Sequence, residues 1–210
     1  MSPLISERVR LLHAQQNAAR AQRWKPPEVW AGQARSGGVG YDELRGLSEA
    51  QVRQKVEPLL EPDFLLDREI TGVSLIDGKK YRLDLVLQPK DLDSWGKDRV
   101  FFGVEFKRAC NFKTIDVGHF TRQAISYHFV EWQHYGRLPV LVCPDLQFYG
   151  GASEVKSELA RVMSAFGVLE LNPARMEINY SSTHTLWTAR SGVTKAGRGY
   201  TRLGIYRTGH

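Results

Sequence analysis

Two strand-like segments joined by a turn constrain the fold of this chain most strongly. Residues 64–76 (FLLDREITGVSLI) and 80–87 (KYRLDLVL) are rich in aliphatic, β-branched and aromatic residues. The pair Asp77-Gly78 between them is a strong signal for a hairpin turn. After a polar loop, residues 100–107 (VFFGVEFK) predict a third strand. The chain is therefore expected to contain a β-sheet with an antiparallel hairpin.

Helical segments flank these strands. Ser48 and Gln51 can form a capping box ahead of an apolar stripe that ends near Pro62. Two further helices are predicted at residues 117–135 and 153–167. Four further strands are predicted at residues 138–144, 176–180, 184–189 and 201–207. This order predicts an α/β fold, in which a mixed β-sheet is covered by helices on at least one face.

The composition supports one globular core with additions at both ends. The 210 residues are 42% apolar and 25% charged, which is typical of a chain that buries a substantial core. Residues 1–47 predict an N-terminal helix, at 3–24, followed by a linker. Residues 48–177 form the expected core, and residues 178–210 form a basic extension.

The extension supplies most of the net charge of +6, because it holds basic residues and no acidic ones. Its basic residues are Arg190, Lys195, Arg198, Arg202 and Arg207. Aromatic residues lie between them, so the extension can bind a polyanion such as a nucleic acid, with cations on phosphates and rings on bases. A solvated tail with a small net charge accounts for the composition equally well.

Other compositional features exclude several classes. The first residues (MSPLISERVRLLH) lack the basic-then-apolar order of a signal peptide, and no apolar run approaches the roughly 20 residues that span a bilayer. We therefore expect a cytoplasmic protein with no membrane partner. Cys110 and Cys143 are too few for a disulfide framework or a four-cysteine zinc site.

Three charged residues, Asp84, Glu105 and Lys107, interrupt the apolar pattern of the strands. Alternation along residues 100–107 predicts that Glu105 and Lys107 share one face, and that Asp84 lies opposite the odd-numbered apolar residues of 81–87. If the two strands are neighbours, Asp84 and Glu105 come close and repel each other unless a cation lies between them. Carboxylates suit Mg²⁺ or Mn²⁺, and a nearby ammonium can orient a water or offset charge on a phosphate.

Alternatives to a metal site at these three residues remain open. A solvated salt bridge on a sheet face would also account for Asp84 and Lys107. A second Glu-x-Lys, at residues 154–156, lies in a predicted helix, where residues two apart point to different sides. His119, His128 and His134 could form a metal site with a carboxylate, but their spacing does not repeat on one helical face.

From residue 48 to about 145, the order of elements resembles the PD-(D/E)XK nuclease superfamily. That pattern is a helix with Glu, a strand with a metal-binding Asp, a strand with (D/E)-x-K and a further helix. The matching positions are Glu57 in VRQKVEPLL, Asp84 in YRLDLVL and Glu105-Phe106-Lys107 in FGVEFK. Gln123 and Tyr127 in RQAISY match the Q-x-x-x-Y signature of some branches. The closest similarity is to the N-terminal nuclease module of type I restriction motor subunits.

The resemblance implies a restriction-endonuclease-like core and a Mg²⁺-dependent nuclease that hydrolyses phosphodiester bonds, with DNA as substrate, in a bacterial or phage setting. Mn²⁺ is expected to replace Mg²⁺. The implied metal ligands are Asp84, Glu105 and the Phe106 carbonyl, assisted by Glu57, for which Glu61 is the alternative. Lys107 is implied to position the attacking water.

Further roles follow from the same resemblance. Gln123 and Tyr127 would support the strand being cut. Lys113 and Arg122, together with the basic extension, would hold the nucleic-acid backbone without reading its sequence. A different class, a non-catalytic nucleic-acid-binding or assembly protein on the same fold, also remains open, although such a protein needs no acids that repel phosphate. The sequence also leaves open the mode of cleavage, the form of nucleic acid and whether the chain acts as a monomer, a homodimer or a larger assembly.

Overall fold

The computed structural model describes residues 37–96, 99–110, 117–149, 159, 161–163, 165–180 and 184–202. The chain divides into two compact units, Met1–Arg35 and Ser36–His210, and all described residues belong to the second. The helix predicted at 3–24, the second Glu-x-Lys at 154–156, Lys113 and Arg207 lie outside the described residues. No helix in the described ranges combines the length and the apolar character that crossing a membrane requires.

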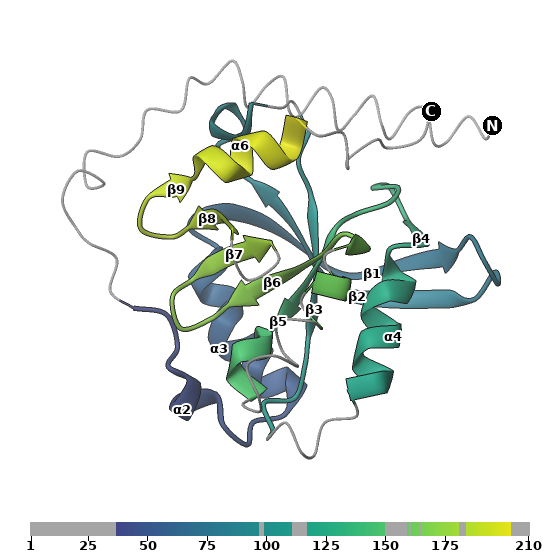
Figure 1. The fold of residues 1–210 in the computed structure, drawn as a ribbon, viewed down its shortest axis with the longest axis horizontal. Helices are drawn as coiled ribbons and strands as arrows, with labels where there is room; N and C mark the ends of the chain where they lie inside the picture. Colours follow the sequence, from purple (N-terminus) through teal and green to yellow (C-terminus); the bar gives the residue numbers. More distant parts are fainter. Residues whose placement is uncertain are drawn as a thin grey trace. The chain divides into compact units, whose positions relative to one another are not determined.

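The described strands form one mixed sheet of nine strands (Figure 1). In sequence order they are β1 Phe64–Ser74, β2 Lys80–Pro89, β3 Phe102–Phe106, β4 Val130–Trp132, β5 Val140–Cys143, β6 Val168–Asn172, β7 Glu177–Tyr180, β8 His184–Thr188 and β9 Gly192–Val193. Their spatial order is β4-β1-β2-β3-β5-β6-β7-β8-β9. β3, β5 and β6 run parallel, and the other neighbours pair antiparallel. The predicted mixed α/β architecture is confirmed.

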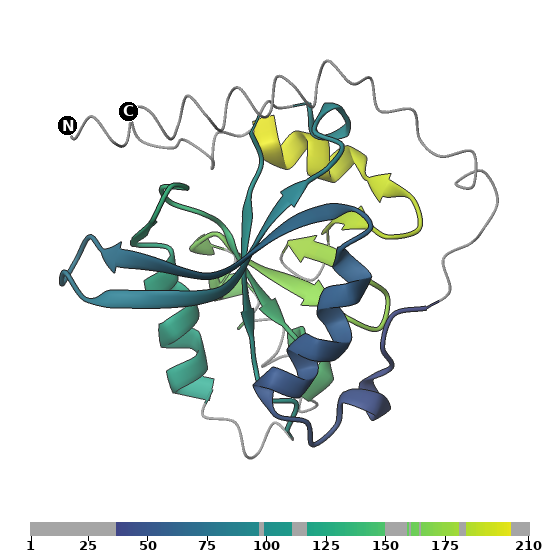
Figure 2. The same cartoon turned by 180° about the vertical axis from the view of Figure 1, so that it is seen from behind.

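Helices cover both faces of this sheet. The helical elements are α2 Tyr41–Leu44, α3 Glu49–Leu60, η2 Asp93–Trp95, α4 Val117–Tyr127, η4 Leu146–Tyr149 and α6 Lys195–Arg202. The predicted cap of α3 is confirmed, because Ser48 Oγ accepts a bond from Gln51 N while the Gln51 side chain accepts one from Ser48 N. Figures 1 and 2 show α3 and α4 on opposite faces of the sheet.

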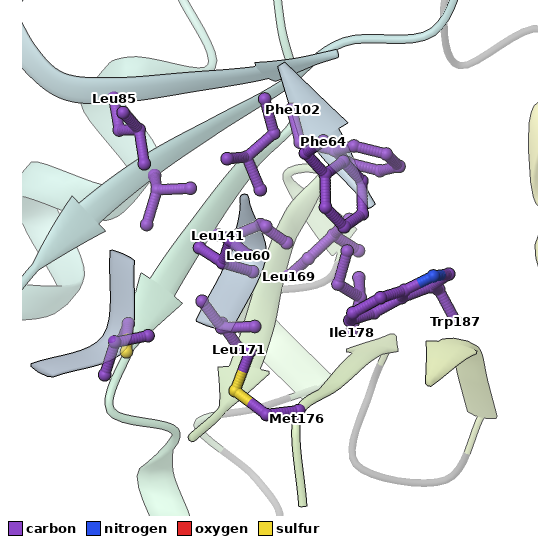
Figure 3. Packing of buried hydrophobic residues seen from close by; sticks show 14 of the residues in the cluster. Leu60, Phe64, Leu85, Phe102, Leu141, Leu169, Leu171, Met176, Ile178 and Trp187 are labelled. Atoms are coloured by element: carbon purple, nitrogen blue, oxygen red, sulfur yellow. The ribbon is translucent and has the colours of Figure 1, made fainter. Parts of the chain in front are cut away.

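The larger hydrophobic core lies on the α3 face. Leu60 of α3 is fully buried, and the aromatic rings of Phe64 and Trp187 pack edge to face with centroids 4.9 Å apart. Figure 3 shows that this core also gathers side chains of the central strands, including Phe102 and Leu141. Smaller clusters on the other face include Ala124 and Tyr127 of α4. The central strands are therefore buried on both faces, which explains their nearly continuous apolar sequences.

The predicted alternation of β2 is wrong at its middle, because the strand changes faces there. Leu83 packs in the cluster on the α4 face, whereas Leu85 and Leu87 belong to the core on the α3 face. The pairing of β1 with β2 skips the position between Leu85 and Leu83, where Glu69 of β1 has a φ of 57°. A positive φ is uncommon for glutamate. The residue of β2 at this irregularity is Asp84.

Two other predictions of secondary structure are corrected. The helix predicted at 117–135 ends at Tyr127, and residues 130–132 instead form β4, whose alternate side chains are buried and which pairs with the end of β1. Residues 201–202 are helical, because they continue α6, and not part of a strand. The boundary predicted at residue 178 falls inside β7, from which the sheet continues into β8 and β9.

Candidate functional site

Five side chains named from the sequence come together beside the end of β3. The Phe106 N–H donates to Asp84 Oδ2 at 2.8 Å, and Lys107 Nζ donates to Glu105 Oε1 at 2.6 Å. From α4, Gln123 Nε2 reaches Glu105 Oε1 at 3.0 Å and Tyr127 OH at 2.8 Å. The site therefore brings together two carboxylates, one ammonium and two polar groups. Side-chain hydrogen bonds join Glu105 to Lys107 and Gln123, and Gln123 to Tyr127, whereas Asp84 bonds to the backbone between Glu105 and Lys107.

The pairing of β2 with β3 brings the two acids together. These strands pair antiparallel with Leu85 opposite Val104, and the same register extended by one residue sets Asp84 beside Glu105. Gly103 makes this approach feasible, because a Cβ at that position would overlap the Leu83 side chain. Because β2 changes faces at Asp84, the carboxylate of this residue can accept the hydrogen bond from the Phe106 N–H of β3.

Burial dominates the electrostatics of Glu105. Only 8% of this residue is exposed, and burial together with the charge of Asp84 raises its pKa to about 7, although Lys107 acts in the opposite direction. Burial and the neighbouring Glu105 also raise the pKa of the Tyr127 hydroxyl, which therefore stays protonated. Glu105 is thus a carboxylate held near the balance between its charged and neutral forms, and a nearby cation would favour the charged form.

An open cleft of about 540 Å³ lies beside Asp84 on the α3 side. It is lined by Glu49, Ala50, Arg53, Gln54, Glu57, Glu69, Arg82, Asp84 and Phe106. Asp84 Oδ1 has no hydrogen-bond or ion-pair partner among the described residues. One oxygen of Asp84 is therefore available to a ligand that enters the cleft.

Glu57 lies in this cleft, but its carboxylate is already engaged. Arg53 Nε donates to Glu57 Oε2 at 3.0 Å, and Arg68 of β1 contacts Glu57 Oε1. The alternative residue, Glu61, is exposed, does not line the cleft and lies 3.6 Å from Arg68 Nη2. Of the two glutamates, Glu57 is the one beside the site, where it holds two arginines in place.

Sequence reasoning missed Glu49. This residue follows the Ser48 cap at the start of α3, lines the cleft and places Oε1 3.9 Å from Lys107 Nζ. Its position in the first turn after a cap was a signal in the sequence, since acidic residues favour helix N-termini. The signal did not show that the first turn of α3 lies beside the end of β3.

Those basic residues named from the sequence whose side chains the structure describes do not gather at this site. Arg122 is exposed on α4, one residue before Gln123. Among the basic residues of the extension, Arg190, Lys195 and Arg198 have described side chains, and all three are exposed. The side chain of Arg202 is not among those that the structure describes. Helix α6 packs near η2, whose Trp95 ring contacts Phe102 at the start of β3, whereas Lys107 follows the end of that strand.

The donor atoms of the site fit a hard divalent cation only in part. Within the described ranges, no group of three His, Cys, Asp or Glu side chains is arranged to hold a metal ion, and this includes His128 and His134. Asp84 and Glu105 nevertheless provide two carboxylates close enough for one to raise the pKa of the other. Mg²⁺ is commonly held by one or two carboxylates together with waters and substrate phosphates, so this pair meets the minimum requirement.

Comparisons of the chain with protein-family models, with curated proteins and with solved structures give no match. The function must therefore be argued from the site itself.

Proposed function

We propose that this chain is a Mg²⁺-dependent nuclease that hydrolyses phosphodiester bonds in DNA. The observation that carries the proposal is the convergence of Asp84, Glu105 and Lys107 with Gln123 and Tyr127 beside an open cleft. A structural salt bridge would need only one acid for Lys107. It would not need a second carboxylate that raises the pKa of the first.

The fold agrees with the proposal. A helix with a cleft-lining glutamate (α3), a strand with Asp84 (β2), a strand with Glu105 and Lys107 (β3) and a helix with Gln123 (α4) follow each other as in the PD-(D/E)XK pattern. β5 then runs parallel to β3 and completes the centre of the sheet. We infer that this centre is a restriction-endonuclease-like core.

Each group has a defined task in this proposal. Asp84 and Glu105, with the Phe106 carbonyl, would hold Mg²⁺, or Mn²⁺ in its place, which when bound supplies Lewis-acid polarisation of a phosphoryl oxygen. Lys107 offsets charge that builds on the phosphate and orients the attacking water. Gln123 fixes the Glu105 carboxylate through its bond to Oε1. Arg53 lines the cleft beside Asp84, where it pairs with Glu57 at 3.0 Å and Glu69 at 2.7 Å, and in this proposal it gives the backbone phosphates a cationic contact.

Incubation with supercoiled and linear DNA in Mg²⁺ or in EDTA tests the proposal. The wild-type chain should cleave in Mg²⁺ alone, and cleavage of the circular form would identify an endonuclease. Glu105→Gln should abolish cleavage, because an amide lacks the negative charge that attracts the metal. The matched control is Glu61→Gln, since Glu61 is an exposed glutamate outside the cleft, and it should cleave at the wild-type rate. DNA that is bound but left intact in Mg²⁺ would favour the non-catalytic binding protein.

A further inference from the structure

The far end of the β1–β2 hairpin exposes two large aliphatic side chains on a well-held turn. Leu75 is 60% exposed and Ile76 is 72% exposed. The backbone beneath them is satisfied, because Ser74 Oγ accepts from Ile76 N and Asp77 N at 3.2 and 3.3 Å, and Leu75 N donates to the Phe129 carbonyl at 2.8 Å. Aliphatic side chains that stay exposed contribute little to the stability of the folded state. Because these two lie side by side on an ordered turn, they indicate a contact surface.

One face of this hairpin is covered and the other is open. On the covered face, Gly72 packs closely against Val130 and Trp132 of β4, and the Tyr81 ring contacts that of Tyr127 with centroids 5.7 Å apart. The residues of the open face are Thr71, Val73, Lys80 and Arg82, all of them exposed. Figure 2 views the hairpin from the open face, with α4 behind it.

The open face links the tip to the candidate site. Arg82 lines the cleft beside Asp84 and is 69% exposed, although its Nε pairs with Glu69 at 3.1 Å. Lys80 lies two residues closer to the tip, and the Lys79 side chain at the turn is 73% exposed and pairs with Asp77 at 3.0 Å. A polyanion whose backbone enters the cleft would therefore meet cations along the hairpin and an aliphatic pair at its end.

We propose that the β1–β2 hairpin is a duplex-DNA-binding arm, in which Lys80 and Arg82 contact phosphates while Leu75 and Ile76 wedge between base pairs and bend the duplex. This inference rests on the proposed function and names duplex DNA as the substrate. Aliphatic side chains act as wedges in proteins that kink duplexes, whereas proteins that hold unpaired bases use aromatic rings, which this tip lacks.

The geometry sets the position of the bend. Asp84 lies four positions along the chain from Lys80, and the turn extends about two positions further, so the tip lies about 20 Å from Asp84 at about 3.3 Å per residue. At about 3.4 Å per base pair, this distance corresponds to about six base pairs. The bend is therefore expected about half a helical turn from the bond that is cut.

Energy transfer between dyes at the two ends of a duplex of about 30 base pairs measures the bend. This length is far below the persistence length of about 150 base pairs, so the free duplex is nearly straight. In Ca²⁺, the wild-type chain should increase the transfer. The double variant Leu75→Ser/Ile76→Ser should leave the duplex straight and bind it about tenfold more weakly. Leu65→Ser is the matched control, because Leu65 is 54% exposed at the other end of β1, and it should behave as wild type.

The charged part of the arm has its own control. Lys80→Ala should reduce the slope of log binding constant against log salt by about 0.9, the amount for one lost duplex phosphate contact. Lys55→Ala removes an exposed lysine of α3 that does not line the cleft, and should leave the slope unchanged.

The outcomes separate this inference from the proposed function. Tip-dependent bending without cleavage in Mg²⁺ would uphold the arm and overturn the nuclease. Normal cleavage with equal binding and bending by wild type and the tip variant would overturn the arm alone. A tip variant that sediments as a monomer while wild type sediments as a dimer would make the tip a self-association surface, which also overturns the arm. A wild-type chain that neither binds nor cuts DNA would overturn both.

Discussion

Glu105→Gln is expected to make the metal-free protein more stable at pH 8. Glu105 titrates near pH 7 in the folded chain against an ordinary pKa of 4.5, and this value already includes the attraction of Lys107. At about 1.4 kcal/mol per pH unit, the difference corresponds to about 3 kcal/mol of destabilisation when the buried carboxylate is charged. The amide keeps an oxygen that can accept from Lys107 and Gln123, but carries no charge.

The sign follows from proton binding. Between about pH 4.5 and 7, the folded chain retains a proton on Glu105 that the unfolded chain has released, so the free energy of unfolding of the wild type falls as pH rises. The variant lacks this contribution. Its stability advantage should therefore grow by about 2 to 3 kcal/mol between pH 5 and pH 8, which corresponds to about 4 to 12 °C in Tm.

Urea denaturation in EDTA at both pH values measures this change. Asp145 titrates in the same range, because burial raises its pKa to about 7, but it does so in both proteins and cancels in the comparison. A variant less stable than wild type at pH 8 would refute the reasoning, since that result is expected if Glu105 is a structural partner of Lys107. A stability difference that does not change with pH would refute it as well.

Three further predictions address catalysis, binding and packing. Lys107→Ala should spare DNA binding in Ca²⁺ but slow cleavage by roughly 10²- to 10³-fold, and Lys107→Arg should not restore the rate, which single-turnover kinetics can measure. Gly103→Ala should lower the free energy of unfolding by about 1 to 3 kcal/mol through overlap with a core leucine, whereas Gly199→Ala, which meets open space, should not; urea titration compares the two. If the extension binds phosphates, alanine in place of the basic residues whose side chains are described should weaken the salt dependence of DNA binding. The slope of log binding constant against log salt should become smaller by about 0.9 for each lost contact. The residues replaced are Arg190, Lys195 and Arg198.

The sequence predicted the elements whose signals are local. Asp77-Gly78 identified the hairpin, Ser48 and Gln51 identified the start of α3, and alternation along β3 predicted that Glu105 and Lys107 share a face. The bond between Lys107 and Glu105 agrees with that alternation. Each of these signals depends on residues within a few positions of each other, so it can be read without knowledge of the tertiary structure.

The features that sequence reasoning missed depend on distant partners. The face change at Asp84 accompanies an irregularity at Glu69, on the neighbouring strand. No local sequence pattern predicts this face change. The engagement of Glu57 by Arg68 joins a helix to a strand and follows from how α3 packs on the sheet. β6 was missed because residues 168–172 (VLELN) directly follow a predicted helix, and a short apolar run there does not distinguish a strand from a helix end.

The rate of DNA cleavage by Asp84→Asn tests the central claim most directly. The single-turnover rate in Mg²⁺ is compared with that of wild type and of Asp42→Asn, a matched control whose side chain is 95% exposed. If Asp84 holds the metal beside the cleft, Asp84→Asn should slow cleavage at least about a hundredfold, by analogy with the loss of one preorganised catalytic group, while Asp42→Asn matches wild type. A folded Asp84→Asn variant that cleaves DNA at the wild-type rate would contradict the account.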